Sequence, residues 1–143
     1  MTYGPVDFVA LGFKTDQLTG EGLAALLDLV EKQIVRVIDL VIILKDMDGN
    51  HQVLEIEELA PKLLALFDPL EVEVSGIIQV EDIKAIADAM ENNTTAALLL
   101  VENLWAIQFA EAVKGASGQL LLFDRIPFEV VNEMMDTFAQ AEA

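Results

Sequence analysis

Two stretches of this chain repeat one order of residue patterns: a strand-type run, an amphipathic helix pattern and a second strand-type run. In the first stretch, the apolar run VDFVALGF (6–13) precedes a helix pattern in which apolar residues recur every three or four positions from Leu23 to Ile34. Thr19 is placed to cap that helix, and the β-branched run 35–45 follows it. This order predicts a right-handed crossover between two parallel strands.

The second stretch contains the strand-type run 96–103, a helix pattern over 104–116 and the strand-type run 119–126. Pro127 then stands in the first turn of a final helix. With two such units, the sequence predicts an α/β (α+β) fold, namely a ferredoxin-like split-βαβ sheet of about five strands with helices packed on it.

The middle of the chain adds a hairpin and two helices. Strand-type runs at 35–45 and 51–59 flank an Asp48-Gly49 turn, and alternation in the second run predicts an edge strand. Helix patterns cover 60–67 and 80–90, while the stretch 70–77 fits either a short strand or a loop. The run 6–13 lacks alternation, so we expect a strand covered on both faces.

Length and composition predict one acidic domain over residues 1–143. The chain has no cysteine, which excludes a disulfide framework and makes the cytoplasm the default location. The first residues do not resemble a signal peptide, and charged residues interrupt every long apolar run, so we expect no membrane span.

The formal net charge is −17, which argues against nucleic acid as a partner. Acidic residues are densest between Asp46 and Glu91, where a cationic protein or divalent ions would dock; a solvated acidic surface is the simpler interpretation. Apolar residues nevertheless make up 54% of the chain. Contacts between subunits are the natural place for this surplus of apolar area.

The hairpin turn carries part of a calcium-loop pattern. Asp46, Asp48, Asn50 and Glu57 stand at positions 1, 3, 5 and 12 of that pattern. His51 occupies the position that requires glycine, and the flanking segments are strand-type rather than helical. We therefore keep these four residues only as weak metal candidates and predict no metal site and no cofactor.

Catalytic signatures are missing from the sequence. His51 is the single histidine, and Ser75 and Ser117 stand beside glycines with no base nearby in sequence. The segment GASG lacks the spacing of a phosphate-binding loop. The sequence therefore predicts no catalytic residue.

Four carboxylates lie within or at the ends of apolar strand-type runs: Asp7, Asp39, Glu102 and Asp124. If the runs 96–103 and 119–126 pair, Glu102 and Asp124 approach each other, with Arg36 or Arg125 as counter-charge. A structural ion pair or a solvent-facing position is favoured over a paired acid and base. An enzyme is therefore the third hypothesis.

Apolar side chains on two predicted helices are expected to form core or subunit contacts rather than a cofactor site, with core as the default. The final helix is the best candidate for an interfacial or exchanged element, because it is C-terminal and its apolar face needs a partner. The interface candidates are Trp105, Phe109, Val131, Met134, Met135 and Phe138, with Val130 on the same predicted face.

Several segments together resemble a bacterial family, the domain of unknown function 6325, which is akin to the family of unknown function 1269. These segments are GPVDF, the IDLV strand with its DG turn, the acidic VEDI helix, and VENLWA followed by RIP. The resemblance implies a soluble, stand-alone bacterial domain with a stress-related role and no assigned catalytic residue. The related family carries a glycine-rich membrane-associated stretch that this sequence lacks.

The leading hypothesis is a non-enzymatic protein that associates with itself, as a homo-oligomer or a filament. The alternative is a regulatory domain that binds a small ligand or a divalent ion through the acidic middle of the chain. The first predicts a large particle in solution, and the second predicts a rise in melting temperature with calcium or magnesium.

Overall fold

The computed structural model describes residues 4–15, 21–72 and 76–142, and the chain divides into two compact units. The first unit ends at Phe109 and the second begins at Ala110. Thr19, the predicted helix cap, lies outside the described residues. That residues 1–143 form a single domain stays a prediction.

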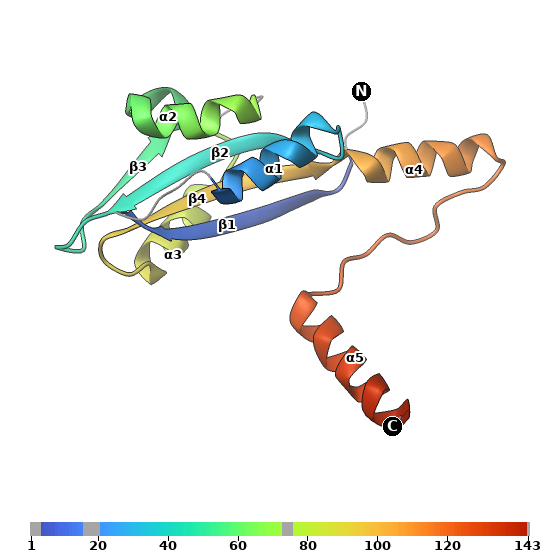
Figure 1. Ribbon diagram of the computed structural model, residues 1–143. Coiled ribbons are helices and arrows are strands. Elements are labelled where there is room, and N and C mark those ends of the chain that lie inside the picture. Colours follow the sequence, from blue (N-terminus) through green and yellow to red (C-terminus); the bar gives the residue numbers. More distant parts are fainter. Residues whose placement is uncertain (1–3, 16–20, 73–75, 143) are drawn as a thin grey trace. The chain divides into compact units, whose positions relative to one another are not determined.

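The first unit is built on one antiparallel sheet of four strands (Figure 1). The strands are β1 (Val6–Lys14), β2 (Val35–Lys45), β3 (His51–Glu55) and β4 (Thr94–Asn103), in the order β1-β4-β2-β3. Both β1 and β2 pair antiparallel with β4, so they run in the same direction with β4 between them. The mixed α and β fold class is confirmed, but the ferredoxin-like arrangement is not.

The prediction that 6–13 is covered on both faces is wrong. β1 lies at an edge of the sheet, and its side chains alternate between partly buried and exposed positions. The exposed positions include Val6 and Phe8, whose side chains are 45% and 43% exposed. Alternation was hidden in the sequence because apolar residues occupy both faces of this strand.

One face of the sheet carries the larger part of the core. Helix α1 (Glu21–Glu31) and helix α2 (Pro61–Phe67) cover this face, since their apolar side chains pack against alternate residues of β2 and β4. Pro61 stands at the start of α2, where its missing N–H costs nothing. The described residues of 70–77 form no strand, which favours the loop interpretation. The fully buried side chains here include Val37, Leu40, Ile42, Phe67, Leu70 and Leu99.

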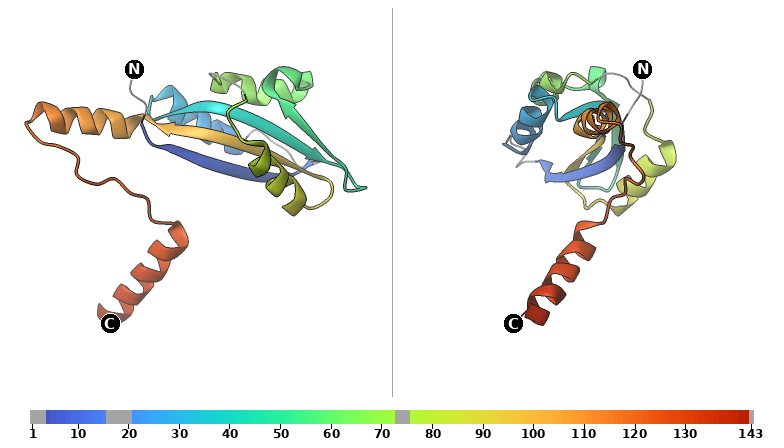
Figure 2. Two further views of the ribbon diagram at one scale, coloured as in Figure 1. Left: turned by 180° about the vertical axis from the view of Figure 1, so that it is seen from behind. Right: turned by 90° about the vertical axis from the view of Figure 1, so that its right-hand side faces the viewer.

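The opposite face is covered by helix α3 (Val80–Ala89), as Figure 2 shows. Ile83, Ile86 and Met90 pack there against Val41, Ile43, Ala96 and Leu98. The Lys45 ammonium donates hydrogen bonds to the carbonyls of Ala87 and Met90, both at 2.9 Å. A cation is favourable at the end of a helix, where the helix dipole places partial negative charge on the last carbonyls.

The predicted hairpin between β2 and β3 is confirmed, with its turn at Asp46–Asn50. The Asp46 N–H donates to the Asn50 carbonyl at 2.9 Å, and the Gly49 N–H donates to the Asp46 carbonyl at 3.2 Å. Gly49 has φ of +86°, a conformation that glycine adopts without strain. β3 is the second edge strand of the sheet, as predicted, but it ends at Glu55 rather than at residue 59, because Ile56–Glu58 form a 3-10 turn.

The remaining helices are α4 (Leu104–Gly115) and α5 (Phe128–Glu142). The predicted fifth strand is not formed. Residues 119–126 have no regular secondary structure. A strand requires a partner edge, and the regular elements described from Ala110 onward are helical. Among the described helices, none combines the length and the apolar character needed to cross a bilayer.

Candidate functional site

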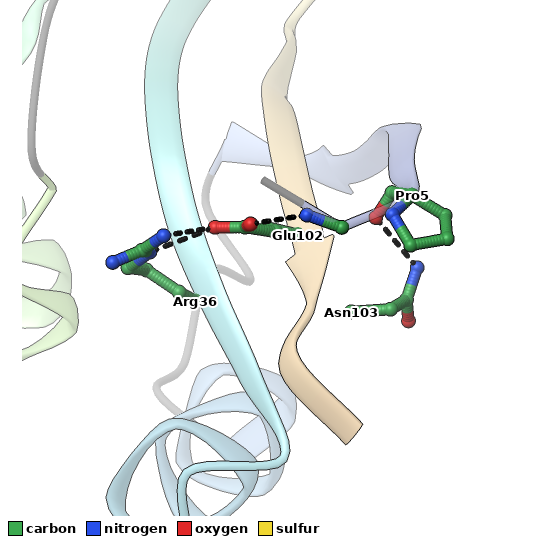
Figure 3. Close-up of polar contacts among 5 residues, drawn as sticks. Pro5, Arg36, Glu102 and Asn103 are labelled. Atoms are coloured by element: carbon green, nitrogen blue, oxygen red, sulfur yellow. Dashed lines mark hydrogen bonds and ion pairs between the residues drawn. The ribbon is translucent and has the colours of Figure 1, made fainter. Parts of the chain in front are cut away.

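A buried ion pair joins the two central strands near the start of β1 (Figure 3). The register places Arg36 of β2 directly opposite Glu102 of β4. The Glu102 side chain is fully buried, and its Oε1 accepts hydrogen bonds from Nε of Arg36, at 2.9 Å, and from Nη2 of the same guanidinium. The Gly4 N–H donates to the other carboxylate oxygen at 2.7 Å.

A second set of polar contacts fixes the end of β4 to the start of β1. The Asn103 N–H donates to the Pro5 carbonyl at 2.9 Å, and the Asn103 side-chain amide donates to Oδ2 of Asp7 at the same distance. The Trp105 indole N–H donates to Oδ1 of Asn103 at 3.3 Å. Gly4 belongs to this junction because a Cβ at its position would lie 2.7 Å from the Ile107 side chain.

Asp39 is a second buried carboxylate, and backbone N–H groups donate to both of its oxygens. It lies beside an irregularity between Val37 and Asp39 in the ladder with β4. Its Oδ1 accepts from the Leu40 N–H, and its Oδ2 accepts from the N–H groups of Ile77 and Ile78, all at 2.8 Å. Three backbone donors satisfy the charge, so Asp39 anchors the loop before α3 to the sheet.

Glu55, at the end of β3, lies in a less favourable electrostatic environment than Asp39 or Glu102. Its side chain forms a capping box with Glu58, whose carboxylate accepts from the Glu55 N–H at 3.0 Å. The other carboxylate oxygen, Oε2, is buried and accepts no hydrogen bond. Desolvation, followed by repulsion from Asp39, Glu57 and Glu58, raises the pKa of Glu55 above its ordinary value.

The buried carboxylates are positioned to hold the fold together. Both oxygens of Glu102 and both oxygens of Asp39 accept hydrogen bonds from the protein. A pocket of 410 Å³ lies near Arg36, with Glu71, Gln33 and Gln108 as its other polar residues. Its lining includes neither Glu102 nor Asp39. These contacts anchor the strands and the loop before α3 to one another.

The predicted approach of Glu102 to Asp124 depended on a strand that is not formed. Glu102 takes Arg36 as its counter-charge, one of the two partners that the sequence suggested. Asp124 lies in the irregular segment 119–126, where its Oδ1 accepts from the Arg125 N–H at 2.8 Å. Asp7 accepts a hydrogen bond from the Asn103 side chain. It lies near the start of β1, and Lys14 lies at the other end of that strand.

Three of the four weak metal candidates, Asp46, Asp48 and Asn50, lie in the hairpin turn. Oδ1 of Asp46 accepts from the N–H groups of Asp48 and Asn50, both at 2.9 Å, while Glu57 lies beyond β3 in the short 3-10 turn Ile56–Glu58. His51 is exposed at the start of β3. Over the described ranges, no three His, Cys, Asp or Glu side chains are grouped so as to hold a metal ion.

The interface candidates all lie at the surface. Trp105 and Phe109 of α4 are exposed, and so are the α5 residues Val131, Met134, Met135 and Phe138. Sequence reasoning missed the exposed face of β1 and the solvent-facing leucines of 119–126. The residue pattern carried no signal for either, because apolar residues occupy both faces of each segment.

Comparison with known proteins gives one result. No curated protein and no solved structure matches the chain. A family model matches residues 2–143, which include the Gly4 contact with Glu102, the hairpin and α5. The chain therefore belongs to the family of unknown function DUF6325.

Proposed function

We propose that this protein works by associating with copies of itself, as a non-enzymatic homo-oligomer or filament. The observation that carries the proposal is the apolar stripe on α5. Phe128, Val131, Met135 and Phe138 recur at spacings of three, four and three residues, and Met134 lies beside them. Each of these side chains is more than a third exposed.

Such a stripe requires a partner. A helix of 15 residues is marginal in water on its own, because most helical stability in proteins comes from packing of the apolar face. Its spacing is that of helices that pack side by side. Apolar patches of this kind on a small domain usually mark a protein contact.

The polar groups of the first unit support the non-enzymatic part of the proposal. Glu102 and Asp39, the most deeply buried carboxylates, bond to groups of the same chain. Asp46, which leads the calcium-like pattern, is bonded to two backbone N–H groups of its own turn. The ion-binding alternative therefore gains no support from this geometry.

The test is the mass of the purified native particle, measured by light scattering, with electron microscopy of the same sample. We expect a particle heavier than the 15.7 kDa chain. A monodisperse monomer at micromolar concentration would contradict the proposal. A rise in melting temperature with millimolar calcium in that monomer would instead support the ion-binding alternative.

A further inference from the structure

β1 offers an edge to which no described strand is paired. Its ladder with β4 runs without a bulge from Val6 to Lys14, and its exposed face includes Val6 and Phe8. Proteins usually protect such an edge with proline, a bulge, charges or a covering element. Between Val6 and Lys14 there is no proline, and the charged residues are Asp7 and Lys14 near the two ends. This edge is therefore open to an added strand.

The segment 119–126 resembles a strand in sequence but pairs with no sheet edge among the described residues. Its sequence QLLLFDRI is that of a strand, but it takes part in no ladder among the described residues. The side chains of Leu121 and Leu122 are 83% and 80% exposed. Its eight residues are one fewer than the nine residues of β1, so the two segments are of similar length. The chain thus contains one edge that lacks a strand and one strand-type segment that lacks an edge.

Charge favours the meeting of these two surfaces. β1 carries Asp7 and Lys14, and the segment 119–126 carries Asp124 and Arg125, so each is neutral within a chain of net charge −17. The other sheet edge, β3, contains Glu55 and leads into further acidic residues. A second copy of an acidic chain is repelled least at the neutral edge.

The connection between β4 and α4 indicates where the segment goes. β4 ends at Asn103 and α4 begins at Leu104, so no loop residue separates them. A crossover that returns to its own sheet must reverse direction after the strand, and the loops that do so are usually about two to six residues long. Because α4 starts without such a loop, we expect the segment 119–126 that follows it to pair with another molecule rather than with its own sheet.

We infer that residues 119–126 of one copy add to the β1 edge of a second copy as its fifth strand. The exchange is reciprocal, and it closes a two-fold dimer of twice the 15.7 kDa chain mass. This inference rests on the proposed self-association and specifies which segments of the two copies pair. Since α5 follows Pro127 directly, the exchange also brings the α5 stripe to the copy whose Val6 and Phe8 are exposed.

The absence of cysteine allows a direct test by cross-linking. Ala10→Cys places one thiol at the middle of the exposed face of β1. Leu121→Cys and Leu122→Cys place one thiol each on the segment, at neighbouring positions because adjacent strand residues face opposite ways. The Ala10→Cys chain is co-expressed with the Leu121→Cys chain or with the Leu122→Cys chain. The two chains carry different affinity tags, and the purified pair is oxidised.

We expect a disulfide-linked heterodimer for at least one pairing. The matched control, Gln52→Cys on the other sheet edge, should give no heterodimer with either partner. A covalent dimer of Ala10→Cys with itself alone would mean that β1 pairs with β1, and the inference would be wrong. So would a disulfide confined to one chain in the double variant Ala10→Cys/Leu122→Cys.

Light scattering of the unmodified protein separates this inference from the proposed function. An oligomer in which neither cysteine pairing cross-links would retain the proposed function and overturn the strand exchange. A monomer would overturn both. The variant Leu121→Asp/Leu122→Asp, changed at exposed positions, should lower the particle mass to that of one chain while the sheet keeps its melting temperature.

Discussion

Glu102 joins three segments of the first unit through one buried carboxylate. It bonds the guanidinium of Arg36 on β2 and the N–H of Gly4 before β1, while it is itself part of β4. Removing one partner of a buried pair leaves the other charge uncompensated. Breaking this pair should therefore cost far more stability than breaking an exposed pair.

We predict that Glu102→Gln lowers the free energy of unfolding by about 3 kcal/mol, because the buried charged contact with the Arg36 guanidinium is lost. Urea denaturation followed by the fluorescence of the single tryptophan measures this change. The control is Lys32→Ala, which removes the exposed pair with Asp28 and should leave stability unchanged within error. Equal losses in the two variants would contradict a special role for the buried pair.

Glu55 should give the protein a pH dependence of opposite sign to that of most carboxylates. Its pKa is raised in the folded state, so the folded protein binds the proton more tightly than the unfolded chain does. The stabilisation is complete at pH values below the ordinary glutamate range and is lost as the pH rises through the raised pKa.

We therefore predict that Glu55→Gln melts at a higher temperature than the unmodified protein at pH 7, and that the difference vanishes in acid. Glutamine keeps an oxygen that accepts the N–H of the capping box. Thermal melts over a pH series measure the effect, with Glu91→Gln as the control for loss of one negative charge. A difference that grows toward low pH would contradict the assignment.

The sequence predicted only some of these residue contacts. Arg36 could be named as a partner of Glu102 because both belong to apolar strands and need compensation. The role of Asp39 could not be predicted, since its donors at Ile77 and Ile78 are backbone N–H groups. Any residue type supplies such donors, so the sequence carries no signal for them.

Among the elements, the β2–β3 hairpin depends on one glycine. Gly49 has φ of +86°, where an L side chain is strained. We predict that Gly49→Ala lowers the free energy of unfolding by about 1 kcal/mol. The matched control is Gly22→Ala in α1, whose added Cβ would meet no atom within 4 Å and should stabilise the helix by about 0.5 kcal/mol. Chemical denaturation of both variants distinguishes backbone strain from a general effect of alanine.

Elements with strong local signals were predicted well, and the failures share one cause. The hairpin, α3, α5 and β4 follow from turn residues and apolar periodicity within each segment. The segment 119–126 has strand-type residues but no strand, and β1 is exposed on one face where cover was expected. Both errors concern the partner of a segment, which periodicity does not specify.

The whole molecule combines a net charge of −17 with apolar surfaces that need partners. Repulsion between copies opposes association over the Debye length, which falls from about 30 Å at 0.01 M salt to about 8 Å at 0.15 M. We predict that the mean particle mass rises as sodium chloride increases over this range. Light scattering at constant protein concentration measures it, with sucrose at matched osmolality as the control. A mass that falls with salt would indicate contacts dominated by ion pairs.

The position of β4 has a consequence for synthesis of the chain. β4 lies between β1 and β2 and pairs with both, yet it begins only at Thr94. Until the ribosome has released that strand, β1 has no neighbour in the sheet, and β2 with β3 is the one strand pair of this sheet that can form. Because the ladder that joins Val6 to Glu102 links the two ends of the first unit, folding should follow translation of most of the chain rather than accompany it.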